Sequence, residues 1–140
     1  MIDILKAIPH REPFLLIDKI VELKGDCIVA IKRLNPEMDV LKGHYPDFPI
    51  MPGVLICEAI FQAAAVLLSW KIGGNQMGLP LVTRIKDAKF KKMIMPTDEI
   101  SLEAELTDQV GPAFYMKGKA KVNGETAASV LFTCKLSNKI

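Results

Sequence analysis

The feature that most constrains this chain is the segment from Gly53 to Trp70, which is apolar on every face of a helix and is interrupted mainly by Glu58, Gln62 and Ser69. Pro52, just before it, suits the first turn of a helix. A helix that is apolar all round must be surrounded, either by the rest of the protein or by lipid. A carboxylate and an amide near its middle argue against a membrane span, so we expect a buried core helix.

Most of the remaining chain alternates between apolar and polar residues, as half-buried strands do. The expected strands cover residues 14–23, 27–34, 79–91, 100–106, 114–122 and 126–136. Asn123-Gly124 is a strong signal for a two-residue hairpin turn, whereas the prolines and glycines of residues 35–52 predict a stiff loop. One apolar helix and about six strands pack economically as a curved antiparallel sheet wrapped around the helix, the α+β hot-dog architecture.

Length and composition restrict the function classes. With 140 residues, of which 50% are hydrophobic, the chain can build one compact core, and we expect a single domain over residues 1–140. A net charge of +2 provides no broad basic field of the kind that nucleic-acid binding requires. Three cysteines without C-x-x-C spacing, and a start unlike a secretory signal, favour the reducing cytoplasm.

Four residues could carry chemistry at one site. Glu58 is a carboxyl group on an apolar helix, so it must be paired, be neutral or be kept for a task such as proton donation. Gln62, four residues later, shares its helix face and could hold it in position. His44 stands in a loop stiffened by prolines, which can aim an imidazole as a base. Gly53 opens the helix, where its N–H could polarise a carbonyl oxygen.

Each of these residues also has a plainer structural interpretation. Glu58 could reach the surface at one edge of the helix, Gln62 could be an amide at the edge of the core, and His44 could be an ordinary loop histidine. His10 is interpreted as structural, because neither an acid partner nor a rigid loop accompanies it in the sequence. The sequence contains no Cys/His cluster, phosphate loop or nucleophile elbow, so we expect no metal and no cofactor.

Residues 43–55, followed by Glu58-Ala59 and Gln62-Ala63, closely resemble the active-site segment of the FabZ-type 3-hydroxyacyl-acyl-carrier-protein dehydratases. Residues 9–18 look like the opening segment of that family, and residues 88–98 look like its central strand and turn. The resemblance therefore covers nearly the whole chain.

This resemblance implies a dehydration mechanism. His44 would remove the α-proton of the thioester, Glu58 would assist departure of the 3-hydroxyl as water, and the Gly53 N–H would polarise the thioester carbonyl. The product would be a trans-2-enoyl group on acyl carrier protein, in type II fatty-acid biosynthesis. Related dehydratase-isomerases carry Asp at the position of Glu58, so Glu favours simple dehydration. The substrate would arrive on the carrier's phosphopantetheine arm, and no other cofactor is implied.

The resemblance also implies partners. In this family two chains pair into one continuous sheet, and each active site takes its histidine from one subunit and its acid from the other. A homodimer is therefore expected, and members of the family commonly assemble three such dimers. The acyl carrier protein is acidic, so a local group of basic residues is expected to dock it. The candidates are Lys86, Lys89, Lys91 and Lys92, each of which could equally be a solvated residue of a strand edge.

The same resemblance implies an apolar tunnel beside the central helix that would hold the acyl chain. Its candidate lining residues are Val82, Arg84 and Ile85. Here the chain departs from the family's aromatic-small-x-Ile-Asp pattern, and Arg84 in place of a small residue is expected to narrow or polarise the tunnel.

Several alternatives stay open at this stage. The chain could be a dehydratase paralogue of a polyene or other secondary acyl pathway, a hot-dog acyl-thioesterase, or a non-catalytic acyl-binding subunit. The segment from His44 to Glu58 argues against a thioesterase, and the presence of both residues argues against a silent subunit.

Overall fold

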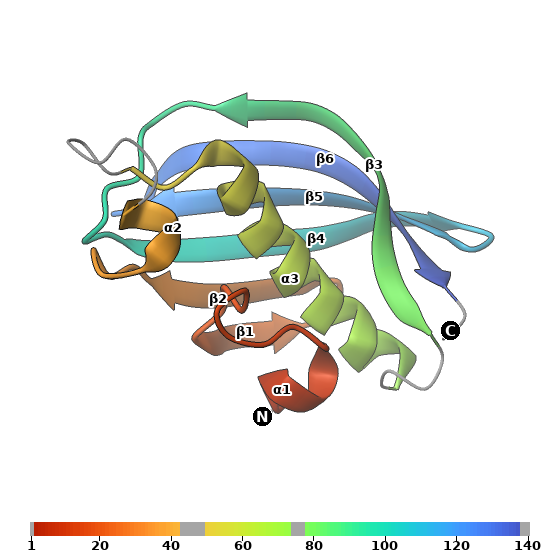
Figure 1. Cartoon of the computed structure of the whole chain (residues 1–140). Coiled ribbons are helices and arrows are strands. Elements are labelled where there is room, and N and C mark those ends of the chain that lie inside the picture. The colour runs from red at the N-terminus through yellow and green to blue at the C-terminus, as the bar shows by residue number, and fades with distance from the viewer. Residues whose placement is uncertain (1, 43–49, 74–77, 138–140) are drawn as a thin grey trace.

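One long helix lies against the inner face of a curved six-stranded antiparallel sheet (Figure 1). This is a computed structural model, and it describes residues 2–42, 50–73 and 78–137. The strands are β1 (Lys19–Lys24), β2 (Cys27–Arg33), β3 (Leu79–Phe90), β4 (Glu99–Val110), β5 (Ala113–Val122) and β6 (Glu125–Ser137). The helices are α1 (Ile4–Ala7), α2 (Asp39–Lys42) and α3 (Gly53–Ile72). The predicted hot-dog architecture is confirmed.

Among the described residues, the central helix α3 contributes more buried apolar residues to the core than any other helix or strand. Its side chains pack on strands β2 to β6, which explains why the sequence is apolar on every face. The helix is long and apolar enough to cross a membrane, but 67% of its most apolar window is buried inside the protein. It ends at Gly73, whose left-handed φ of 86° closes the last turn on Ser69.

Gly118 on β5 lets the helix approach the sheet closely. A Cβ atom at this position would collide with the side chain of Ile60, which is fully buried on α3. The missing side chain therefore sets how deeply α3 sits in the sheet.

The strand order is β1-β2-β4-β5-β6-β3, so β1 and β3 form the two edges. Strand β3 is long and carries large apolar side chains that remain about half exposed, namely Leu81 (50%), Ile85 (53%) and Phe90 (53%). A long edge with exposed apolar side chains is a surface that proteins usually cover or pair.

Local differences from the sequence expectations have physical causes. The hairpin at Asn123-Gly124 is present with both residues at positive φ, 53° and 80°, as its dipeptide predicts. One helical turn, α2, interrupts the loop predicted over residues 35–52. The first strand begins at Lys19 and not at Phe14, because a side chain of α3 takes the hydrogen bonds of the segment before it, as described next.

Candidate active site

Glu58 lies in the second turn of α3. Its side chain is 24% exposed. One carboxylate oxygen, Oε2, accepts a hydrogen bond of 2.9 Å from Nε2 of Gln62, one turn further along the helix. The shared helix face that the spacing predicts thus brings the two side chains into contact.

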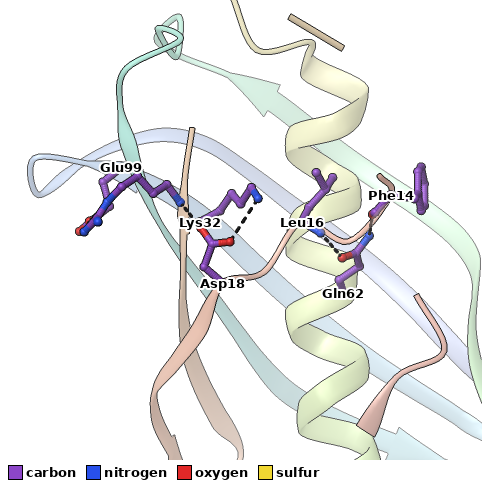
Figure 2. A network of polar contacts seen from close by, with 7 residues as sticks. Phe14, Leu16, Asp18, Lys32, Gln62 and Glu99 are labelled. Carbon is purple, nitrogen blue, oxygen red and sulfur yellow. Dashed lines mark hydrogen bonds and ion pairs between the residues drawn. The ribbon is translucent and has the colours of Figure 1, made fainter. Parts of the chain in front are cut away.

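Gln62 is fully buried, and its amide makes three hydrogen bonds. Figure 2 shows the two that reach Phe14 and Leu16. Besides Glu58, its Nε2 donates to the carbonyl of Phe14 at 2.9 Å, and its Oε1 accepts from the Leu16 N–H at 2.8 Å. The amide therefore pairs with residues 14–16 much as a neighbouring strand would. These bonds satisfy the buried amide and fix its orientation, which in turn fixes Glu58.

His10 is the polar side chain that the sequence interpretation missed. Its Nε2 lies 3.5 Å from Glu58 Oε2, and its ring stacks on Phe14 with centroids 6.1 Å apart and planes at 18°. Arg11 holds the surrounding segment by donating to the carbonyls of Leu5, Ile8 and His10. Its acid partner, Glu58, is 48 positions away in the sequence, so no local pattern reveals the contact. The available signal was the resemblance of residues 9–18 to the opening segment of the family.

A cavity of about 390 Å³, called here the Glu58 cavity, opens beside these groups. His10 and Glu58 line it on the polar side, and the remaining walls are mainly apolar, including Phe61, Val82 and Ile85. An apolar slot with a few converging polar groups is typical of a site for an acyl-type ligand. Two of the three candidate tunnel residues, Val82 and Ile85, thus lie at this cavity.

Arg84 does not line the Glu58 cavity. It borders a hollow of about 280 Å³ on the other face of β3, together with Tyr115 and Thr133. An unbroken strand would put Val82 and Arg84 on the same face. A register shift between these two residues in the pairing with β6 offsets the alternation, so that Val82 and Ile85 share the inner face.

Cys134 also lines the Glu58 cavity. Burial raises the pKa of its thiol to about 12, so the sulfur stays protonated and contributes apolar surface. Burial likewise raises the pKa of Cys57 on α3. Neither thiol has the environment of a nucleophile.

Gly53 opens on a second cavity, of about 370 Å³, called here the Gly53 cavity. Phe90, the last residue of β3, lines it together with Lys91 and Lys92, which follow the strand. The ring of Phe90 lies so close that a Cβ at Gly53 would meet it at 3.0 Å. Among the described residues, no acceptor is found for the Gly53 N–H, which begins the helix.

His44 and Gly43 lie outside the described residues, so the base expected from the sequence stays a prediction. Within the described ranges, no group of three His, Cys, Asp or Glu side chains could hold a metal ion.

The four candidate docking lysines are divided between two places. Lys86 and Lys89 line hollows on the outer side of the sheet, and Lys89 lies 3.7 Å from the Asp87 carboxylate. Lys91 and Lys92 line the Gly53 cavity, where Lys92 also pairs with Glu125 at 2.7 Å. The four lysines therefore line separate hollows.

Comparisons with known proteins show the family of this chain. The family model described as a FabA-like domain matches residues 8–130. A 3-hydroxyacyl-[acyl-carrier-protein] dehydratase FabZ of Halalkalibacterium halodurans is 42% identical over 127 residues, covering 90% of this chain and 90% of that protein. The FabZ of Solibacter usitatus is 38% identical over 137 residues, covering 98% of this chain and 85% of that protein.

Among solved structures, the dehydratase heterocomplex ApeI:P from Xenorhabdus doucetiae matches with a TM-score of 0.85 at 13% identity, covering 99% of this chain and 93% of that one. A hypothetical thioesterase with coenzyme A from Streptococcus pneumoniae matches with a TM-score of 0.68 at 12% identity, covering 96% of this chain and 91% of that one. At these identities the two matches establish the hot-dog fold alone.

The chain therefore belongs to the FabA-like family, and within it to the FabZ-type 3-hydroxyacyl-[acyl-carrier-protein] dehydratases. The predicted enzyme class, a hydro-lyase, is confirmed by these relatives.

Proposed function

We propose that this protein dehydrates (3R)-hydroxyacyl groups, carried as thioesters on acyl carrier protein, to trans-2-enoyl groups in fatty-acid biosynthesis, and that it works in the cytoplasm. The observation that carries the proposal is the carboxyl group of Glu58, held by Gln62 at the wall of an apolar cavity large enough for an acyl chain. A positioned acid in apolar surroundings is what departure of a poor leaving group such as hydroxide requires.

Each step has a residue to perform it. His44 takes the proton from the α-carbon, and the electron pair of that C–H bond enters the enolate, whose oxygen accepts the Gly53 N–H. The pair then forms the carbon–carbon double bond while the bond from the β-carbon to oxygen breaks. The leaving oxygen takes a proton from Glu58 and departs as water. The reaction needs no cofactor beyond the carrier's phosphopantetheine arm.

The site is proposed to be shared between two chains. Gly53 and Glu58 line different cavities of one chain, since residues five apart on a helix point about 140° away from each other. A two-fold axis at the free edge of β3 would pair the strand with its copy in antiparallel fashion. The Phe90 end of one strand would then lie beside the Leu81 end of the other. The Gly53 cavity of each chain would thereby meet the Glu58 cavity of its partner.

The carrier protein is proposed to dock beside the Gly53 cavity. Lys91 and Lys92 are the two candidate lysines there, and Lys91 belongs to no ion pair found among the described residues. A basic group at the cavity mouth would attract an acidic carrier without a large net charge on the whole protein.

The proposed reaction can be tested on 3-hydroxybutyryl-acyl carrier protein by following the ultraviolet absorbance of the conjugated enoyl thioester. We expect turnover in the wild type, and losses of roughly a hundredfold or more in His44→Ala and Glu58→Gln. Glu22→Gln, the same chemical change at an exposed position of β1, is the control and should stay active.

The same assay separates the alternative functions. Release of free thiol without enoyl absorbance would mean a thioesterase. No turnover at any chain length would favour a silent acyl-binding subunit, and turnover restricted to unusual acyl groups would favour a secondary pathway.

The shared site has a separate test. His44→Ala and Glu58→Gln subunits are unfolded together and allowed to reassemble at random. A mixed dimer then contains one intact site, provided that each site draws on both chains. About a quarter of the wild-type activity should return. If each site belongs to one chain, mixing restores nothing.

A further inference from the structure

Oε2 of Glu58 faces two nitrogen atoms, and this asymmetry between its two oxygens is the starting observation. Gln62 Nε2 donates to Oε2 at 2.9 Å, and His10 Nε2 lies 3.5 Å from the same atom. No partner for Oε1 is found among the described residues. The His10 contact is about 0.6 Å longer than a formed N–H···O bond, as is common for catalytic contacts before substrate tightens them.

The burial of His10 Nδ1 favours one tautomer of the imidazole. This nitrogen is buried and has no hydrogen-bond partner among the described residues. A proton on it would leave a buried N–H without an acceptor, both in the imidazolium and in the Nδ1–H tautomer. The neutral Nε2–H tautomer leaves only an unused lone pair there, and it directs the N–H of the ring at Glu58. The stacking on Phe14 contacts the ring itself, and the bond from Arg11 to the His10 carbonyl holds the backbone that carries it.

We infer that His10 is a positioning residue for the acid: its Nε2–H, together with Gln62, reserves Oε2 of Glu58 as an acceptor, so that the transferable proton resides on Oε1. The inference rests on the proposed function, in which Glu58 protonates the leaving hydroxyl. A carboxylic acid that accepts two N–H donors at one oxygen carries its own proton on the other. The same two donors stabilise the carboxylate that forms when the proton has left.

Two amide variants of His10 separate this role from packing. The amide nitrogen of glutamine reaches the place of Nε2, whereas that of asparagine corresponds to Nδ1 and falls short of Glu58. We expect His10→Asn to lower kcat for 3-hydroxybutyryl-acyl carrier protein about tenfold with little change in KM. His10→Gln should retain kcat within about threefold, and both variants should unfold at similar temperatures. Equal losses in the two variants, or full activity of His10→Asn, would overturn the inference.

A measurement that does not depend on turnover is the tautomer of His10 by ¹⁵N NMR. The chain has two histidines, and His44→Ala assigns the remaining signals to His10. We expect the neutral Nε2–H pattern, with an Nε2 resonance that moves in Glu58→Gln. The Nδ1–H tautomer or an imidazolium would refute the inference even in an active enzyme. If the protein shows the Nε2–H tautomer but no dehydratase activity, the proposed function is refuted instead, and with it the transfer of a proton from Glu58 to the leaving hydroxyl.

Discussion

Gln62 donates a 2.9 Å hydrogen bond to Glu58 while the same amide replaces a strand partner for Phe14 and Leu16. One buried side chain therefore connects the candidate acid, the central helix and the segment that carries His10. Changes at Gln62 should affect stability and activity together, which is unusual for a residue that does not line the Glu58 cavity.

Gln62→Met tests this connection. The substitution keeps the volume but leaves the buried Leu16 N–H and the partly buried Phe14 carbonyl without partners, so we expect a loss of roughly 2 kcal/mol in the free energy of unfolding. Urea unfolding measures it. Gln109→Met, at an exposed position of β4, is the control and should change the free energy of unfolding by less than about 0.5 kcal/mol. A stable Gln62→Met protein would show that residues 14–16 are held by other contacts.

Gly118→Ala should destabilise the protein by about 1–3 kcal/mol, because the new methyl group collides with Ile60. The cost should shrink in an Ile60→Ala background, where the colliding atoms are gone. A double-mutant cycle from thermal or urea unfolding gives the coupling energy. Additive costs would place the strain elsewhere than between these two residues.

The buried Cys134 predicts part of the alkaline stability limit. Burial raises the pKa of its thiol from 9.0 to about 12, so the unfolded chain ionises first as the pH rises. The buried, protonated thiol of Cys134 therefore makes its full contribution to the free energy of unfolding below pH 9.0, and this contribution is lost between pH 9.0 and about 12. Cys134→Ala should therefore lose less stability than the wild type over this window, as measured by urea unfolding. Cys27→Ala, at an exposed position, is the control and should change the dependence of the free energy of unfolding on pH less than Cys134→Ala does.

Lys91→Glu tests the carrier-docking surface. At low salt we expect KM for a substrate on acyl carrier protein to rise about three- to tenfold, while KM for the same acyl group on pantetheine alone stays unchanged. Lys135→Glu, on an exposed position of β6, removes the same charge elsewhere and is the control. An equal rise for both substrates would assign Lys91 to the cavity and not to docking.

Val82→Phe should shift the preference toward shorter acyl chains, because the ring fills part of the Glu58 cavity. Arg84→Ala should leave the preference unchanged, since Arg84 borders a hollow on the other face of the strand. Both expectations are checked by measuring kcat/KM of each variant, relative to the wild type, over a series of acyl chain lengths. A strong effect of Arg84→Ala would restore the expectation that this residue shapes the tunnel.

Helical and strand periodicity predicted most of the fold, because each element obeys a local rule. The four-residue spacing of Glu58 and Gln62 predicted their contact for the same reason. The register shift that turns Arg84 outward depends on pairing with β6, which no local pattern of β3 specifies. The approach of His10 to Glu58 depends on how α1 and the following segment dock on α3, so it too required the three-dimensional arrangement.

Strand β3 bounds the Glu58 cavity through Val82 and Ile85 and is at the same time a free edge of the sheet. Two selective pressures consequently act on the same few positions. A substitution on β3 that alters which acyl groups fit the Glu58 cavity would also alter the strand edge through which copies of the protein are proposed to associate. Substrate range and assembly in such a lineage would then evolve together, with compensating changes expected along this one strand.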